Sequence, residues 1–262
     1  MSIATSFASA LPAEGALWAL ILGGLGAIFG SFIAAMVIRW PAGRSVVRGR
    51  SSCDACGATL APRDLVPLVS AVLAGGKCRS CAGPIDPLHW RIEAAALLIG
   101  ASAGALLPGG SAVAAALFGW QLLALAALDI TEFWLPDVLT AALAITGVVV
   151  GLTGVAPDMS NRLIGGACGF GALWAIGAGY RLTRGRDGLG GGDPKLFGAI
   201  GCWLGWQLLP SVLFLAALAG LGVALFRMLT GRGARLDDRM PFGALMAIAA
   251  YPALLAMLVL AP

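Results

Sequence analysis

The stretch Gly15–Ile38, GALWALILGGLGAIFGSFIAAMVI, contains no charged side chain. A helix needs about 20 apolar residues to cross the hydrocarbon core of a bilayer, so this stretch predicts a membrane-spanning helix. Three further stretches, Val138–Pro157, Leu163–Tyr180 and about Phe242–Leu260, predict one crossing each. The whole composition agrees, because 59% of the residues are hydrophobic and only 11% are charged, unlike a soluble globular domain.

Two longer apolar stretches each predict two crossings. Ala94–Leu128 is interrupted by the turn signal Leu107-Pro108-Gly109-Gly110-Ser111, so it predicts two helices joined by a tight hairpin. Leu196–Phe226 is interrupted only by Pro210-Ser211, where one tilted helix competes with two short ones. The basic residues decide between these alternatives.

Lys and Arg gather in alternate loops of the predicted topology. Eight follow the first span, four follow the fifth and four follow the seventh, which is 16 of 17, with Arg162 as the exception. Cytoplasmic loops carry the excess of basic residues, so we expect these loops inside and both termini in the periplasm. One span at Leu196–Phe226 would put the last cluster outside, so eight spans are favoured. The net charge of +4 is then a topology signal and gives little support to nucleic-acid binding. The 16 residues are Arg39, Arg44, Arg48, Arg50, Arg63, Lys77, Arg79, Arg91, Arg181, Arg184, Arg186, Lys195, Arg227, Arg232, Arg235 and Arg239.

One polar segment, from Arg39 to Arg91, is long enough to form a small domain. It contains two Cys-x-x-Cys motifs, Cys53-Asp54-Ala55-Cys56 and Cys78-Arg79-Ser80-Cys81. Four thiolates at this spacing predict a tetrahedral structural zinc site with Cys53, Cys56, Cys78 and Cys81 as ligands. The alternative is two disulfides, which a reducing cytoplasmic face disfavours.

The chain therefore divides into three expected parts: 1–38 with the periplasmic N-terminus and first span, 39–91 as the cytoplasmic zinc-knuckle domain, and 92–262 as a seven-helix membrane core. The first 14 residues carry no basic residue, so no cleavable signal peptide is expected. The only histidine, His89, has no nearby Ser or Cys nucleophile, which argues against triad chemistry.

Two aspartates stand beside predicted spans at the same membrane surface. Asp129 ends the third span and Asp193 opens the sixth. Carboxylates cost free energy in hydrocarbon, so their presence here needs an explanation. Two carboxylates from separate helices could hold a water between them, one as base and the other as acid. Asp137, which follows Pro136, is more simply the N-terminal cap of the fourth span.

The loop before Asp193 is rich in glycine. Gly188, Gly190, Gly191 and Gly192 exceed what a helix cap requires, and they predict a loop that lets a substrate backbone approach the carboxylate. A phosphate-binding loop is the alternative, but the Gly-Lys-Ser/Thr ending is missing.

Six motifs in order resemble the type IV prepilin peptidases, also called leader peptidase/N-methyltransferases, which include the type II secretion pseudopilin peptidases. They are Gly30-Ser31-Phe32, the double Cys-x-x-Cys, Glu93, Asp129 with Pro136-Asp137, the glycine-rich stretch ending at Asp193 with Lys195 after it, and Pro241-Phe242-Gly243.

The resemblance implies a membrane aspartyl endopeptidase of the bacterial inner membrane, with Asp129 and Asp193 as the catalytic pair. It implies prepilin or pseudopilin substrates with a short basic leader, cut after a glycine at the cytoplasmic membrane face. Gly188, Gly190, Gly192, Lys195 and Asp137 are expected to support the substrate and the loop. Glu93 is the candidate residue for a second activity, N-methylation with S-adenosylmethionine.

We thus predict an all-α polytopic membrane protein of about eight spans, with a small cytoplasmic zinc domain between the first two. Two alternatives are an N-methyltransferase alone, which would not need the aspartates, and a transporter that relays protons through membrane carboxylates. The transporter is disfavoured because both aspartates lie at one surface and no inverted repeat is evident.

Overall fold

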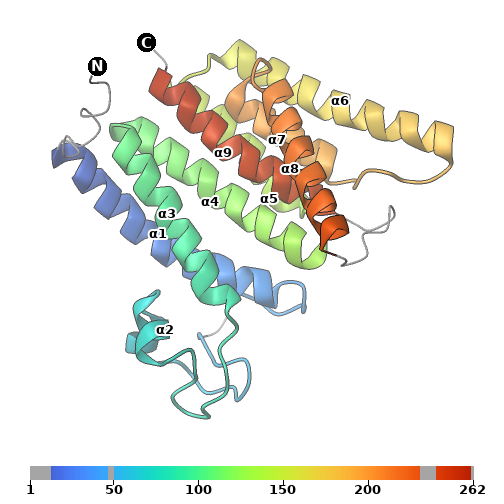
Figure 1. Ribbon diagram of the computed structural model, residues 1–262. Coiled ribbons are helices and arrows are strands. Elements are labelled where there is room, and N and C mark those ends of the chain that lie inside the picture. Colours follow the sequence, from blue (N-terminus) through green and yellow to red (C-terminus); the bar gives the residue numbers. More distant parts are fainter. Residues whose placement is uncertain (1–12, 47–49, 231–239, 261–262) are drawn as a thin grey trace. The chain divides into compact units, whose positions relative to one another are not determined.

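The computed structural model describes residues 13–46, 50–230 and 240–260, and these residues are helical apart from loops and two isolated bridges (Figure 1). The all-helical prediction is confirmed for these parts of the chain. The chain forms two compact units, Met1–Trp120 and Gln121–Pro262. The predicted periplasmic N-terminus up to residue 12, and Arg48, Arg232, Arg235 and Arg239, lie outside the described residues.

In the first unit, α1 (Ala13–Arg39) and α3 (Leu88–Leu106) pack as a close antiparallel pair (Figure 1). Glycines on both helices make this possible. A Cβ on Gly30 would lie 2.7 Å from Cα of Glu93, and a Cβ on Gly104 would lie 2.4 Å from the backbone of Trp18. Small residues of this kind let membrane helices approach through their backbones. Gly30 of the first motif is therefore a packing residue.

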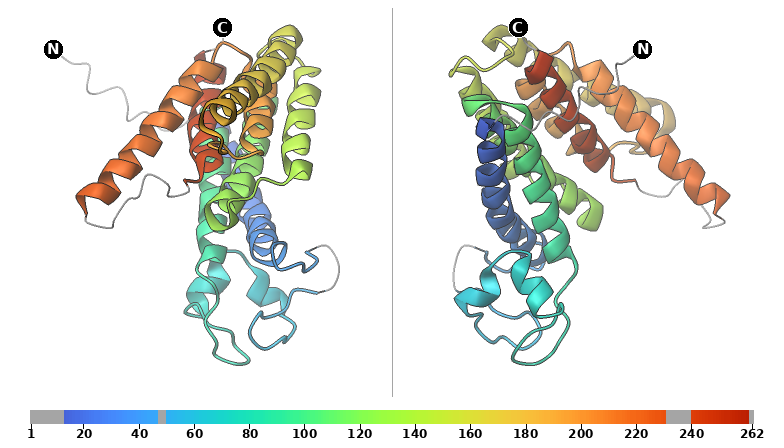
Figure 2. Two further views of the ribbon diagram at one scale, coloured as in Figure 1. Left: turned by 90° about the vertical axis from the view of Figure 1, so that its right-hand side faces the viewer. Right: turned by 60° about the vertical axis from the view of Figure 1, so that its left-hand side comes forward.

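Between these helices, the knuckle segment contains a 3-10 turn, Pro62–Leu65, and the short helix α2 (Val69–Leu73). Figure 2 shows this segment beyond the ends of α1 and α3. Arg39, the last residue of α1, ties the two parts together, because its guanidinium donates to the carbonyl of Ser52 and lies 3.6 Å from the carboxylate of Asp54.

The remaining helices are α4 (Gly109–Glu132), α5 (Asp137–Gly151), α6 (Met159–Arg184), α7 (Asp193–Leu204), α8 (Leu209–Leu229) and α9 (Phe242–Leu260). The chain passes from the first unit to the second within α4. In the second unit, α7 lies between α5, α6 and α9, and 10 of its 12 residues are buried. The hairpin expected at Leu107–Ser111 is confirmed, since α3 ends at Leu106 and α4 begins at Gly109.

The long stretch Leu196–Phe226 forms two helices, as the charge pattern favoured, but the break lies earlier than Pro210-Ser211. Gly205 ends α7 with a φ of +71°, a left-handed conformation that glycine adopts without strain. Pro210 sits in the first turn of α8, where its missing N–H costs nothing. Proline therefore starts the second helix and glycine ends the first.

Among the residues that the structure describes, five helices are long and apolar enough to cross a membrane: α1, α4, α6, α8 and α9. Their outer faces expose large apolar side chains such as Leu20, Trp174 and Phe214, as lipid-facing helices do. The structure thus fits a polytopic membrane protein. The eight-span count remains a prediction, because α3, α5 and α7 do not meet the same criterion.

Arg162, the exception in the charge pattern, is completely buried on α6. Its guanidinium donates five hydrogen bonds of 2.8–3.0 Å to backbone carbonyls, those of Gly147, Val155, Ala156, Pro157 and Cys202. These carbonyls belong to α5, α7 and the loop before α6. Arg162 therefore joins three parts of the second unit, and this internal use explains why its position does not follow the charge rule for loops.

Candidate active site and metal centre

Asp129 lies in the last turn of α4 and is buried. Its Oδ2 accepts the backbone N–H of Ala244, in the first turn of α9, at 2.7 Å. Gly243 permits this contact, because a Cβ there would lie 3.0 Å from Asp129 Oδ2 and 2.8 Å from Leu135 Cδ1. The sequence alone indicates no role for the Pro241-Phe242-Gly243 motif. In the structure it presents a helix N-terminus to a carboxylate.

Asp193 is the first residue of α7 and is also buried. Its Oδ2 accepts the backbone N–H of Gly190 at 3.0 Å, so the carboxylate folds back over its own loop. Gly192, and not Asp193, occupies the cap position of this helix. A plain capping role therefore does not explain the residue.

The two aspartates line one pocket of about 720 Å³ in the second unit. The glycine-rich loop from Gly188 to Gly192 forms one wall. The rest of the lining is largely aromatic and apolar, with two charged side chains; it comprises Phe133, Trp134, Leu135, Tyr180, Arg186, Asp187, Leu189, Met240 and Phe242. Sequence reasoning brought the two aspartates and the loop together but missed these apolar walls, which carry no motif apart from Phe242.

The glycines of this loop act mainly by making room. A Cβ on Gly188 would lie 2.5 Å from the Tyr180 ring, one on Gly190 would lie 2.9 Å from Asp193 Oδ2, and one on Gly192 would lie 2.7 Å from Leu135 Cβ. Only Gly191 has open space at this position. If a substrate backbone approaches this loop, Gly191 is the glycine that has room for it.

Lys195 and Asp137 form an ion pair at the starts of α7 and α5, with Nζ 2.6 Å from Oδ1. Asp137 is the first helical residue of α5, and the cap position belongs to Pro136, so the capping interpretation of Asp137 was wrong. Both side chains are well exposed and neither lines the pocket. The pair joins the helix that carries Asp193 to the helix that follows the Asp129 segment.

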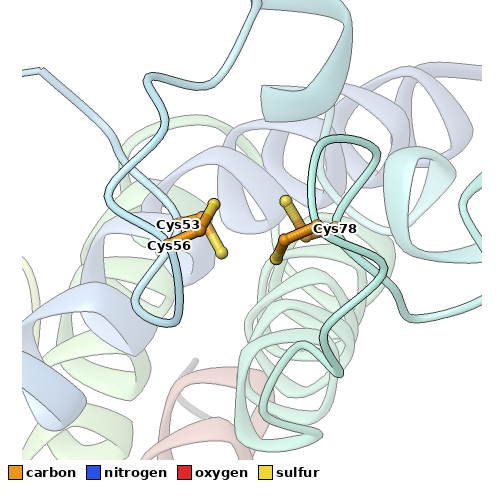
Figure 3. A group of neighbouring side chains, drawn as sticks. Cys53, Cys56 and Cys78 are labelled. Atoms are coloured by element: carbon orange, nitrogen blue, oxygen red, sulfur yellow. The ribbon is translucent and has the colours of Figure 1, made fainter.

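The four predicted metal ligands come together in the first unit. The Sγ atoms of Cys53, Cys56, Cys78 and Cys81 all lie within 4.8 Å of one another, and Figure 3 shows the two knuckles facing each other. All six cysteines of the chain are free thiols. Tetrahedral coordination with metal–sulfur bonds of about 2.3 Å puts the sulfurs about 3.8 Å apart, which lies within this limit. The donor set therefore fits a metal ion.

Each knuckle has the same backbone pattern. Gly57 N–H donates to the Cys53 carbonyl and Ala82 N–H donates to the Cys78 carbonyl, at 2.9 and 2.8 Å. Gly57 ends the first knuckle with a φ of +73°, and Ala82 takes the same place in the second with a φ of +56°. Backbone groups of Cys81 and Ser80 lower the pKa of the Cys78 thiol to about 6. A backbone group of Gly83 lowers the pKa of Cys81, but the neighbouring thiols and burial raise it to about 11, so Cys78 loses its proton first.

Glu93, the candidate for methylation, is buried in the second turn of α3. Its Oε2 accepts the backbone N–H of Leu68 at 2.7 Å, across 25 residues of sequence. Leu68 has a φ of +61°, an unusual conformation for a branched side chain, which requires such support. The structure thus places Glu93 as an anchor for the segment between the knuckles.

Comparisons with known proteins match both units. Residues 25–105 match the Bacterial Peptidase A24 N-terminal domain, and residues 116–225 match the Type IV leader peptidase family. A protein of Burkholderia pseudomallei named "Prepilin leader peptidase/N-methyltransferase" is 39% identical over 208 residues, 79% of this chain and 67% of that protein. The chain belongs to the type IV leader peptidase family. It is therefore a peptidase of the aspartic type.

Two further relatives carry the same name. The one from Pseudomonas aeruginosa is 36% identical over 214 residues, which cover 80% of this chain and 73% of the relative. The one from Pectobacterium carotovorum is 32% identical over 267 residues, which cover 92% and 93%. No solved structure matches the chain.

Proposed function

We propose that the chain removes the leader peptide from type IV prepilins or pseudopilins and that Asp129 and Asp193 activate the water that cuts the bond. The observation that carries this proposal is their placement on different helices, both buried, in the wall of one pocket. The curated relatives, which are named for leader peptidase activity, supply the substrate class.

In this mechanism, one carboxylate takes a proton from the water while the water oxygen attacks the scissile carbonyl carbon. The other carboxyl donates a proton to the leaving nitrogen as the carbon–nitrogen bond breaks, so the pair starts with one shared proton. Each Oδ2 is fixed by a backbone N–H, from Ala244 for Asp129 and from Gly190 for Asp193. We assign the water contact to the Oδ1 atoms.

The pocket walls match the chemistry expected where the leader peptide meets the pilin helix. The open position at Gly191 gives an extended substrate backbone room beside Asp193. Trp134, Met240 and Phe242 give the apolar start of a pilin helix a surface to contact. We assign Gly188, Gly190 and Gly192 to loop support and the Lys195–Asp137 pair to the placement of α7.

We further propose that the enzyme has eight spans in the bacterial inner membrane, with the knuckle domain at 39–91 and the active site on the cytoplasmic side, cutting after a glycine. The clustering of basic residues in alternate loops supports this orientation. We assign structural zinc to the four cysteines, since a four-thiolate site is typical of zinc.

A second activity, N-methylation of the new N-terminal residue with S-adenosylmethionine, is proposed because the relatives are named for both activities. The Glu93 carboxylate is buried and already accepts the Leu68 N–H, so its side chain fits a positioning role better than contact with the methyl donor. Mass spectrometry of the cleaved pilin, with the donor supplied, would detect the methyl increment. An unmethylated product would leave the chain a peptidase alone.

The deciding experiment for cleavage is incubation of purified enzyme with a prepilin in detergent. We expect Asp129→Asn and Asp193→Asn each to reduce cleavage to background, since each removes one half of the pair. Glu132→Gln is the matched control, because it removes an exposed carboxylate at the end of the helix that carries Asp129 and outside the pocket lining, and it should retain activity within a few-fold. Normal cleavage by either pocket variant would refute the mechanism.

A further inference from the structure

Between the two knuckles, the chain exposes a row of apolar side chains. We call these residues the α2 face; they are Leu65, Val66, Val69, Val72 and Leu73, exposed by 43%, 45%, 52%, 79% and 72%. All five lie within nine consecutive residues, on α2 and the turn before it. So dense an apolar surface on a small polar module indicates contact with a partner or a lipid.

The anchor at Glu93 fixes the depth of this face. Leu68, directly before α2, donates its N–H to Glu93, and Glu93 packs against Gly30 of α1. Gly30 lies nine residues before Arg39, where the apolar stretch of α1 ends. At 1.5 Å per residue this separation is about 14 Å along the helix. The start of the α2 face is therefore tied to a carboxylate whose backbone packs on the apolar part of α1, while the segment itself lies beyond the helix ends (Figure 2).

Side chains at this level of α1 already face outward. Phe29 and Phe32, on either side of Gly30, are each 47% exposed, as lipid-facing residues of a spanning helix are. Large apolar side chains are thus exposed both on the membrane-spanning part of α1 and on the α2 face. Figure 2 shows α2 close to the start of α3, where the Glu93 anchor lies.

The flanking residues are those of a membrane–water interface. Trp90 and Arg91 in the first turn of α3 are exposed and in contact, with the guanidinium carbon 5.6 Å from the ring centroid. Tryptophan is enriched at this level, and arginine reaches from it to the headgroups. Arg63 and Lys77, both exposed, flank the face in sequence and suit anionic phospholipid.

From this geometry we infer that the α2 face inserts into the cytoplasmic leaflet beside α1 and α3, so that the knuckle module is held on the membrane by lipid as well as by its two connections. Glu93 sets the depth by holding the backbone of Leu68. The module is then an interfacial element with its apolar side in the acyl boundary, as in monotopic amphipathic segments.

Site-specific photo-crosslinking tests this placement. The photoreactive residue p-benzoylphenylalanine replaces Val72 in one full-length protein and Thr59, an exposed residue of the first knuckle, in another. Each protein is reconstituted in vesicles of phosphatidylethanolamine and phosphatidylglycerol, irradiated and analysed by mass spectrometry. We expect phospholipid adducts at position 72 at several-fold higher yield than at position 59. Position 73 provides a second probe of the same face if the substitution at 72 lowers the unfolding temperature.

Three results would overturn the inference. They are the absence of a lipid adduct at both 72 and 73, equal adduct yields at 72 and 59, and, with a prepilin added, a product at 72 that carries the prepilin in place of phospholipid. The last result would assign the face to the substrate. Because crosslinking to lipid needs no cleavage, the outcome is independent of the proposed peptidase mechanism.

Discussion

The position of a single carboxylate, that of Asp129, depends on a glycine more than 100 residues away. Gly243 leaves no side chain between α9 and the carboxylate, and the adjacent Ala244 N–H then bonds Asp129 Oδ2 at 2.7 Å. Gly243 and Gly192, the residue directly before Asp193, both pack against the Leu135 side chain. Leu135 thus lies between the loop before Asp193 and the start of α9, whose backbone bonds Asp129, and both approaches need a residue without a Cβ.

Gly243→Ala should therefore displace Asp129 and reduce prepilin cleavage, by on the order of 100-fold if the shift approaches 1 Å. The added methyl would lie 3.0 Å from Asp129 Oδ2 and 2.8 Å from Leu135 Cδ1. Gly222→Ala is the matched control, since a Cβ there meets no atom within 4 Å and alanine favours the helix. The measurement is the initial cleavage rate in detergent. Equal rates for the two variants would show that the Gly243 contact does not position the carboxylate.

The sequence could predict that the two aspartates lie at one site, because a carboxylate beside an apolar stretch costs free energy and needs a reason. It could not predict their immediate partners, since Ala244 is 115 residues from Asp129 and a backbone N–H leaves no trace in a sequence. The same limit applies to Glu93, which was noticed as a motif residue but bonds the backbone of Leu68.

At the scale of helices, the second unit is held together by an arginine without an acidic partner among its hydrogen-bond acceptors. Arg162 donates only to carbonyls of α5, α7 and the loop before α6. Trp203 adds a further link, because its indole N–H donates to the Leu143 carbonyl of α5 at 2.7 Å. The far end of α7 is thus fixed to α5, while Lys195 and Asp137 link the end near the pocket.

Arg162→Met should lower the free energy of unfolding by roughly 3 kcal/mol or more, because each buried carbonyl that loses its donor costs about 1–3 kcal/mol. Arg184→Met, at the exposed end of the same helix, should change the unfolding temperature little. Thermal unfolding of both variants in detergent checks this expectation. Similar curves for the two proteins would mean that the five carbonyls find other donors.

The four cysteines were predicted correctly as a cluster, because two Cys-x-x-Cys motifs at this spacing are typical of one shared site. The prediction that Leu196–Phe226 forms two helices was confirmed, but the break was expected at Pro210 and lies before it. Pro210 begins the second helix and does not interrupt one. The spacing of apolar residues could not show that α7 would be only 12 residues long and mostly buried.

Purified protein should contain about one zinc ion per chain, as a four-thiolate site binds. Cys78→Ser should lose it, whereas Cys168→Ser, on α6 and outside the cluster, should keep it. Protons compete with zinc for the four thiolates, so we expect the ion to be held at pH 7 and released on acidification. Elemental analysis measures the ion. A metal content near zero in the wild-type protein would contradict the site.

At the scale of the whole molecule, the charge pattern predicts an orientation with eight spans, but the helix lengths raise a question about α7. Its 12 residues span about 18 Å, well short of the roughly 30 Å of a bilayer core. If α7 crosses, as proposed, one of its ends must lie below the membrane surface. The end that carries Asp193 lines a pocket, which is the kind of place where irregular backbone is tolerated at membrane depth.

Reporter fusions after Thr230, the residue that follows α8, decide whether α7 crosses. With eight spans, this position is cytoplasmic, so a fused green fluorescent protein should be bright and a fused alkaline phosphatase inactive. If α7 only dips into the membrane and returns, α8 would carry the chain outward and the two signals would be exchanged. A fusion at Gly154, between α5 and α6, serves as the periplasmic control, and should give active phosphatase in either case. Active phosphatase at Thr230 would refute the eight-span arrangement, whereas the pocket and its two aspartates would remain as described.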